Sequence, residues 1–139
     1  MKSDCPLNFG LELFGDRWTL LIIRDMIFFN KRSYNEFLSS AEHISTNILA
    51  NRLNFLEKEK FIIKERDQDH KQKMIYSLTE KGIGLVPLII EIGLWSDRYA
   101  EETLTVSELV NLNDFKTDWS KALRALQQKL YHLHLQREI

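Results

Sequence analysis

The sequence is short of residues that interrupt helices or cross-link chains. Its 139 residues include one cysteine, Cys5, two prolines, Pro6 and Pro87, and five glycines. A single cysteine excludes a disulfide within the chain, so any disulfide must join Cys5 to another chain or to a small thiol. The scarcity of proline and glycine leaves long stretches that can be helical, and this favours a mainly helical fold.

The chain also lacks a long apolar run and a strong net charge. No apolar run reaches the roughly 18 residues of a membrane-spanning helix, and the N-terminus lacks the apolar core of a signal peptide, so we expect a cytoplasmic protein with no membrane partner. The net charge of −1 argues against a nonspecific basic coat for nucleic acid. A content of 44% hydrophobic and 28% charged residues is typical of a folded domain rather than a disordered chain.

Two helices are predicted in the N-terminal part of the chain. Leu7, Leu11 and Phe14 share one face of a first helix, which ends at Gly15. The segment RWTLLIIRDMIFF, residues 17–29, is apolar on nearly all sides. It therefore predicts a second helix that is buried at the centre of the core.

A helix, a short turn and another helix are predicted next. Ser33 is followed three residues later by Glu36, a capping-box pattern that starts a short third helix. After the polar break SSAEHIS, Ser45 is expected to cap a fourth helix that runs to about Lys60. The arrangement is that of a helix-turn-helix.

The fourth helix has two contrasting faces. The three-and-four spacing of apolar residues predicts a buried face formed by Ile48, Leu49, Leu53 and Leu56. The opposite face is short-chained and uncharged, with Thr46, Asn47, Ala50, Asn51 and Asn54. Asn can pair with adenine, and Thr and Ala can contact the thymine methyl group, so this face suits a recognition helix that reads bases in the major groove.

The next segment predicts a β-hairpin. FIIKER and KMIYSL are β-prone runs on either side of the charged tip DQDHKQ. Beside a helix-turn-helix, such a hairpin is either a DNA-contacting wing or a means of completing the core. On the first reading, the candidate DNA-binding residues of the whole chain are Arg32, Ser33, Ser45, Thr46, Asn47, Ala50, Asn51, Arg52, Lys64, Arg66, His70, Lys71 and Lys73.

Several ordered motifs resemble one family. CPLNFGLELFGDRWTLLIIRDM, RSYNEF, ISTNILANRLNFLE, YSLTEKG and LVPLIIEIGLW are together similar to the HxlR-type winged helix-turn-helix transcriptional regulators, over roughly Cys5 to Tyr99. The resemblance implies a bacterial homodimer that binds a pseudo-palindromic operator in double-stranded DNA. In some members a cysteine at the position of Cys5 senses oxidants or electrophiles. The family's recognition helix often carries more Lys or Arg than the single early cation here, Arg52.

Residues 103–139 have no counterpart in that family, so the C-terminal part is interpreted from its pattern. A helix over residues 85–99, which Pro87 starts or kinks, and a tail helix capped by Asp114 both carry heptad-spaced apolar residues. We therefore divide the chain into a winged helix-turn-helix domain with dimerisation helices, 1–101, and a helical extension, 102–139. If the tail crosses onto a second subunit, the dimer interface comprises Leu7, Leu11, Leu88, Ile92, Trp95, Tyr99, Trp119, Leu123, Leu126, Leu130 and Leu133. The alternative is that the tail folds back on its own domain.

The fold class predicted is mainly α (α+β): a winged helix-turn-helix with a two-stranded β wing and C-terminal dimerisation helices. No catalytic triad, cofactor motif or metal cluster is apparent, since His132 and His134 point to nearly opposite sides of a helix. Arg24, Asp25, Arg17 and Asp16 are expected to form surface or helix-dipole pairs rather than a site. The function predicted is sequence-specific transcription regulation, with a redox or electrophile response at Cys5 or a plain packing role for that thiol. No motif identifies a small-molecule inducer. The rival function is a winged-helix adaptor that binds protein instead of DNA.

Overall fold

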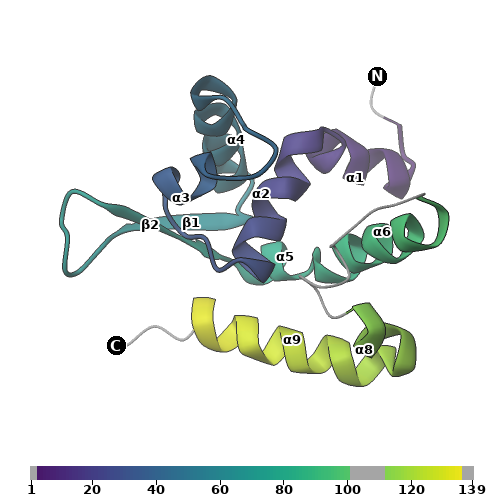
Figure 1. The fold of residues 1–139 in the computed structure, drawn as a ribbon. Helices are drawn as coiled ribbons and strands as arrows, with labels where there is room; N and C mark the ends of the chain where they lie inside the picture. Colours follow the sequence, from purple (N-terminus) through teal and green to yellow (C-terminus); the bar gives the residue numbers. More distant parts are fainter. Residues whose placement is uncertain (1–2, 101–111, 136–139) are drawn as a thin grey trace.

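The computed structural model describes residues 3–100 and 112–135 of the chain. Within these residues, eight helices and two strands are arranged around a single core. Figure 1 shows their arrangement. In this part of the chain no helix is long and apolar enough to cross a membrane. The elements are α1 (Pro6–Phe14), α2 (Arg17–Phe28), α3 (Tyr34–Leu38), α4 (Thr46–Lys58), β1 (Ile62–Arg66), β2 (Met74–Leu78), α5 (Glu80–Ile83), α6 (Val86–Tyr99), α8 (Leu112–Thr117) and α9 (Trp119–His134).

The corner between α1 and α2 has a specific local cause. The Gly15 N–H donates to the Leu11 carbonyl oxygen at 2.8 Å, and a Cβ atom at Gly15 would lie 2.3 Å from that same oxygen. Only glycine therefore ends α1 at this point without displacing the backbone. The next residue, Asp16, caps α2 by accepting hydrogen bonds from the Trp18 and Thr19 N–H groups. As predicted, α2 is central: half of its apolar residues are buried, and the other half are partly buried.

The predicted helix-turn-helix is confirmed in α3 and α4. Ser33 caps α3 by accepting from the Glu36 N–H, and Ser45 caps α4 by accepting from the Ile48 N–H at 3.2 Å. Between the helices, His43 has φ 58°, a left-handed conformation that reverses the chain in a short space. The Tyr34 hydroxyl donates to the Thr46 carbonyl at 3.3 Å, which links the first helix to the start of the second.

The predicted hairpin is also confirmed. β1 and β2 pair antiparallel, with Ile62 opposite Leu78 at the base and Arg66 opposite Met74 near the tip. The base of the sheet is buried, and the pair extends away from the body of the molecule as a wing (Figure 1). Below the sheet, α5 packs so closely that a Cβ atom on Gly82 would lie 2.3 Å from the Phe61 carbonyl oxygen.

The tail differs from the single Asp114-capped helix predicted. Asp114 lies inside α8, and Asp118 caps a separate α9 by accepting from the Lys121 N–H at 3.2 Å. Asp118 has extended backbone, φ −148° and ψ 92°, which interrupts the helical path. The heptad pattern could not reveal this break because apolar residues on both sides of it pack on the same core.

The tail folds back on its own domain, as the alternative interpretation held. α9 runs along the body below β2 and α5 (Figure 1), and Leu112, Phe115 and Leu130 join the same buried core as α2 and α4. Leu130 has no exposed surface, so its assignment to a dimer interface is corrected: it fills the core of its own chain. At the far end of α9, the buried ring of His134 accepts a hydrogen bond at Nδ1 from the Leu78 N–H of β2 at 3.0 Å.

Candidate nucleic-acid interface

The outer face of α4 is the first part of the candidate site. Leu49, Leu53 and Leu56 are buried, which leaves the other side of the helix in contact with solvent. As predicted from the sequence, that side carries short uncharged side chains, and all of them are exposed: Thr46, Asn47, Ala50, Asn51 and Asn54. These side chains let a polar surface approach the helix backbone closely.

Ile48 was assigned to the buried face, and this assignment is wrong. Its side chain is 38% exposed. Ile48 lies at the boundary between the two faces, in the first turn of α4, where the neighbouring α3 does not cover it. An exposed apolar residue beside Asn47 and Asn51 adds a group that can contact a thymine methyl, so Ile48 belongs to the candidate site.

The three amides on this face differ in what they already bind. The Asn51 Oδ1 atom accepts hydrogen bonds from Arg52 Nε at 3.0 Å and from an Arg52 terminal nitrogen at 2.8 Å. No hydrogen bond involves the side chain of Asn47 or Asn54 within residues 3–100 and 112–135. Asn47, in the first turn of α4, and Asn54 therefore keep both donor and acceptor available to a base edge.

Arg52, predicted to contact phosphate, is turned toward the chain itself. Its guanidinium lies 3.3 Å from Asp16 Oδ1 and 4.6 Å from the centre of the Phe55 ring. Burial of Asp16 raises its pKa, but hydrogen bonds from Thr19 and the charge of Arg52 more than offset this, so the pKa lies below the ordinary value. The contact ties α4 to the start of α2 and leaves Arg52 poorly placed for DNA.

Arg32 and Ser33 were also predicted at the DNA surface, and the structure gives both of them internal roles. The Arg32 Nε atom donates to the Tyr76 carbonyl at 3.1 Å, and a terminal nitrogen of Arg32 donates to the Ser77 hydroxyl. The Arg32 carbonyl in turn accepts from the Tyr76 N–H at 2.8 Å, so this segment lies along β2 like a short additional strand. Ser33 is only 5% exposed, and its hydroxyl caps α3, so it is not available to DNA in this structure.

The wing supplies the remaining cations. Lys64 lies 3.9 Å from Glu57 of α4, and an Arg66 terminal nitrogen donates to the Lys71 carbonyl at 2.9 Å, which closes the tip. His70, Lys71 and Lys73 are exposed at or next to the tip. The structure therefore separates the predicted basic residues into two groups, one that shapes the wing and one that remains available at its end.

A groove lies between the wing tip and the start of α3. It has a volume of about 940 Å³ and is bordered by Tyr34 and Asn35 on the α3 side and by His70, Lys71 and Lys73 on the wing side. Its lining is polar and of mixed charge, because Glu36 and Asp69 lie there beside His70, Lys71 and Lys73. The lysines are the groups in it that can contact a sugar-phosphate strand. The sequence could not show this groove, because its two walls lie far apart along the chain.

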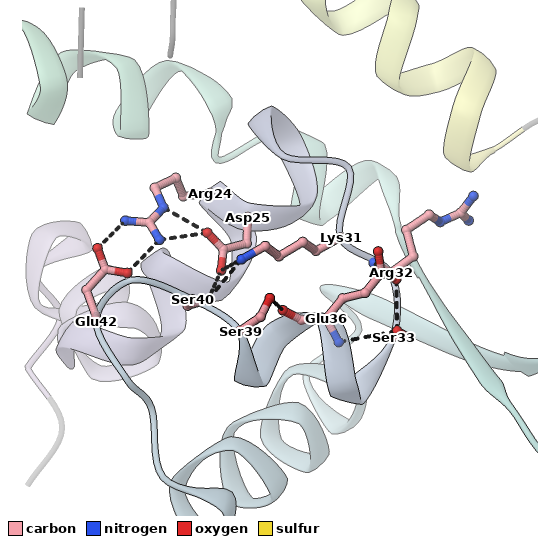
Figure 2. Close-up of polar contacts among 9 residues, drawn as sticks. All are labelled: Arg24, Asp25, Lys31, Arg32, Ser33, Glu36, Ser39, Ser40 and Glu42. Carbon is pink, nitrogen blue, oxygen red and sulfur yellow. Dashed lines mark hydrogen bonds and ion pairs between the residues drawn. The ribbon is translucent and has the colours of Figure 1, made fainter. Parts of the chain in front are cut away.

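A buried polar network fixes the turn that precedes α4 (Figure 2). Asp25, only 2% exposed, accepts from Arg24 at 2.7 Å and from the Ser40 hydroxyl, and it lies 3.7 Å from Lys31 Nζ. Arg24 also donates to both carboxylate oxygens of Glu42 at 2.8 Å. These two hydrogen bonds lower the pKa of Glu42 to about 2. Arg24 and Asp25 do form an ion pair, but the expected surface position is wrong, because Asp25 is buried and the network joins α2 to the α3–α4 turn.

A second exposed surface lies away from the wing. α1 has no buried residue, and Leu7, Phe9 and Leu11 are 71%, 64% and 53% exposed. On α6, Trp95 and Tyr99 are both 62% exposed, with ring centres 5.3 Å apart. Leu7, Leu11, Ile92, Trp95 and Tyr99 were expected at a dimer interface and are exposed here, Leu88 is half-buried, and Phe9 was overlooked.

The remaining tail residues of that expectation behave differently. Trp119, Leu123 and Leu126 are half-buried against the core of their own chain, and Leu133 is 38% exposed. Cys5 is exposed immediately before α1 and makes no side-chain hydrogen bond to cap that helix. Among the described residues no group of three or more His, Cys, Asp or Glu side chains could hold a metal ion.

The helix-turn-helix, the exposed polar face of α4 and the wing define a winged helix-turn-helix protein, and the relatives with this fold are transcriptional regulators. Residues 13–104 match the model of the HxlR-like helix-turn-helix family, and the chain belongs to this family.

Relatives agree with this assignment. The transcriptional regulator YodB of Bacillus subtilis is 34% identical over 108 residues, which cover 77% of this chain and 96% of YodB. The reduced form of YodB superimposes with a TM-score of 0.57 at 30% identity, over 73% of this chain and 100% of that one. The oxidised form of the redox regulator HypR gives a TM-score of 0.62 at 27% identity, over 70% and 99% of the two chains. YodB is also known in diamide-treated and quinone-bound crystal forms.

Proposed function

We propose that this protein is a homodimeric regulator that reads a specific DNA sequence with α4. The observation that carries the proposal is the exposed, uncharged face of α4 beside the wing. On that face Asn47 can donate to and accept from one adenine, while Ala50 and Ile48 can contact thymine methyl groups. A face built for solvent alone would more often carry Lys and Glu.

The wing tip supplies the phosphate contacts in this proposal. Lys71 and Lys73 form one border of the groove that faces α3, and neither has an ion pair among the described side chains. A DNA strand in that groove would bring phosphates to both lysines while α4 lies in the adjacent major groove. Such contacts hold the protein in register without selecting a sequence.

Two copies would associate through α1 and α6. A nine-residue helix with no buried residue has too few interactions to be stable in water, so α1 needs a partner surface. Trp95 and Tyr99 supply a paired aromatic patch of the kind that dominates interface energies. A twofold axis through this surface would place two α4 helices about one DNA turn apart, roughly 34–36 Å, as a pseudo-palindromic site requires.

Cys5 is the candidate for a chemical signal. Its thiol is exposed at the first residue of the proposed interface, directly before α1. YodB has been crystallised after diamide treatment and with bound quinone, and HypR is described as a redox regulator, which supports a thiol response in this family. A new group or disulfide at Cys5 would alter how two α1 helices pack, and therefore the distance between the two recognition helices.

Substitutions on α4 test the proposal. Asn47→Ala is expected to weaken binding to the operator by about 1–3 kcal/mol, roughly 5- to 150-fold, because one base loses two hydrogen bonds. Asn113→Ala, an equivalent change at an exposed position of α8, is the matched control and should leave the affinity unchanged. Equal affinity for all three proteins, measured by fluorescence anisotropy, would move the reading surface away from α4.

A protein-binding adaptor remains the second candidate. It is favoured by the internal engagement of Arg32 and Arg52, which removes two cations from the expected DNA surface. An adaptor of this kind would show no salt-dependent affinity for DNA, whereas a regulator loses affinity as counterions compete for phosphate.

A further inference from the structure

A cavity of about 570 Å³ lies between α1, α2 and α6, apart from the DNA surface. It adjoins the proposed dimer interface, because Leu11, Leu88 and Ile92 belong to both. Its walls are mostly apolar and include Phe14, Leu20, Leu21 and Leu88. A volume of this size and apolar walls with a few polar groups at one end are typical of sites for small ligands.

One wall comes from the C-terminal extension. Leu112 of α8 is 2% exposed and lines the cavity, and a Cβ atom on Gly93 of α6 would lie 3.6 Å from Leu112 Cδ2. Leu112 follows residue 104, where the match to the family model ends. The extension therefore contributes one residue, Leu112, to the wall of a cavity that is partly open to solvent.

The other end of the cavity is charged. Arg17, Arg24, Asp16 and Glu42 line it. Arg24 is paired with Glu42 and Asp25, and Asp16 with Arg52. Arg17 makes no ion pair or hydrogen bond to a side chain in the described part of the molecule, although its guanidinium lies 4.7 Å from the centre of the Trp18 ring. Arg17 is exposed, and its charge contributes to the lowered pKa of Glu42, but its guanidinium is not in direct contact with a carboxylate among the described residues.

We propose that this cavity binds a small apolar carboxylic acid, with its apolar part between α2, α6 and Leu112 and its carboxylate on Arg17. One carboxylate matches one unpaired guanidinium, and the fork of N–H donors on Arg suits a carboxylate geometrically. A neutral apolar molecule would leave Arg17 unmatched, and a dianion would exceed the single available charge.

Such a ligand would act on DNA binding through Glu42. Glu42 lies in the turn before α4 and is held by Arg24, whose guanidinium borders the same cavity. A carboxylate on Arg17 would offset the positive charge that Arg17 presents to Glu42, weaken the attachment of the turn to α2 and so shift the position of α4. This second step depends on the proposed function, whereas binding in the cavity does not.

Isothermal titration calorimetry with 2-naphthoate as the probe tests binding, with 2-naphthamide as the uncharged counterpart. Wild type is expected to bind the acid about tenfold or more tightly than the amide, because the amide cannot form the charge-assisted pair. Arg17→Gln should weaken acid binding by about tenfold, while Arg124→Gln, an exposed arginine on α9 outside the cavity, should not change it. No binding of 2-naphthoate by folded wild type, equal binding of acid and amide, or unchanged binding by Arg17→Gln would each overturn the proposal.

Anisotropy with DNA from upstream of the protein's own gene separates the two claims. DNA binding without 2-naphthoate binding would refute the cavity and leave the proposed function standing. 2-Naphthoate binding without any DNA binding would refute the function and leave the cavity standing. If both occur, DNA affinity should change by about threefold or more with saturating 2-naphthoate in wild type. The same affinity with and without the acid would refute the coupling through Glu42.

Discussion

His134 gives the tail a pH-dependent attachment to the wing, and its effect can be calculated. The Leu78 N–H donates to Nδ1, so the neutral ring carries its proton on Nε2, and Nε2 has no partner within the described part of the chain. Burial, together with the charge of nearby Arg32, lowers the pKa of His134 to about 4. Protonation of Nδ1 would break the hydrogen bond to Leu78 and place a positive charge beside Arg32.

The sign follows from linkage between protonation and folding. Above pH 6.5 the ring is neutral in both the folded and the unfolded chain, so its contribution to stability is complete. As the pH falls toward 4, the unfolded chain gains a proton that the folded chain cannot accept, and stability is lost. A folded pKa of about 4 against the ordinary 6.5 corresponds to about 2 kcal/mol lost between pH 7.5 and pH 5.

Urea unfolding of wild type and His134→Asn at pH 7.5 and pH 5 measures this loss. Asparagine retains an acceptor near the position of Nδ1 but does not titrate, so the wild type should lose about 2 kcal/mol more than the variant. His132→Asn, on the exposed side of the same helix, should behave like the wild type. Equal losses in wild type and His134→Asn would refute the reasoning.

Three further predictions concern the core, the proposed interface and the thiol. Leu130→Ala should lower the free energy of unfolding by about 3–4 kcal/mol, because the side chain is fully buried. The control Leu133→Ala should lower it by less than about 1 kcal/mol. Equal losses for the two variants in denaturant titrations would contradict packing of the tail on its own domain. Trp95→Ala should weaken self-association by about 2 kcal/mol or more in sedimentation experiments, whereas the control Tyr131→Ala on α9 should leave it unchanged. If the wild type is a monomer at micromolar concentration, the proposed α1–α6 dimer is refuted. Cys5→Ser should abolish any change in DNA affinity caused by diamide, and a persistent change would place the sensor elsewhere.

The sequence predicts the winged helix-turn-helix well because its signals are local. Ser33 and Ser45 cap the two helices as their patterns indicate, and the hairpin begins and ends within one residue of the predicted strands. In α4, the helical spacing of apolar residues correctly predicts burial of Leu49, Leu53 and Leu56, and the opposite face is exposed. Such features depend on neighbours a few residues apart, which a sequence pattern records directly.

The sequence-based predictions fail where contacts between distant segments determine the position of a side chain. Arg32 reaches Tyr76 and Ser77 of β2, and Asp25 is buried by Ser40 and Lys31, so neither role can be deduced from local spacing. The apolar repeat of the tail is compatible with a partner subunit or with the chain's own core. Packing of Leu130 against that core favours the latter in this structure.

The central claim is that the protein binds a specific DNA sequence through α4 and the wing tip. Its most direct test is fluorescence anisotropy of the reduced protein with its upstream DNA and with a scrambled duplex over a series of salt concentrations. The account predicts preference for the upstream DNA and a slope of log affinity against log salt of about −3 to −4, if Lys71 and Lys73 of two subunits each neutralise one phosphate. Equal affinity for both duplexes, or an affinity that does not change with salt, would contradict it.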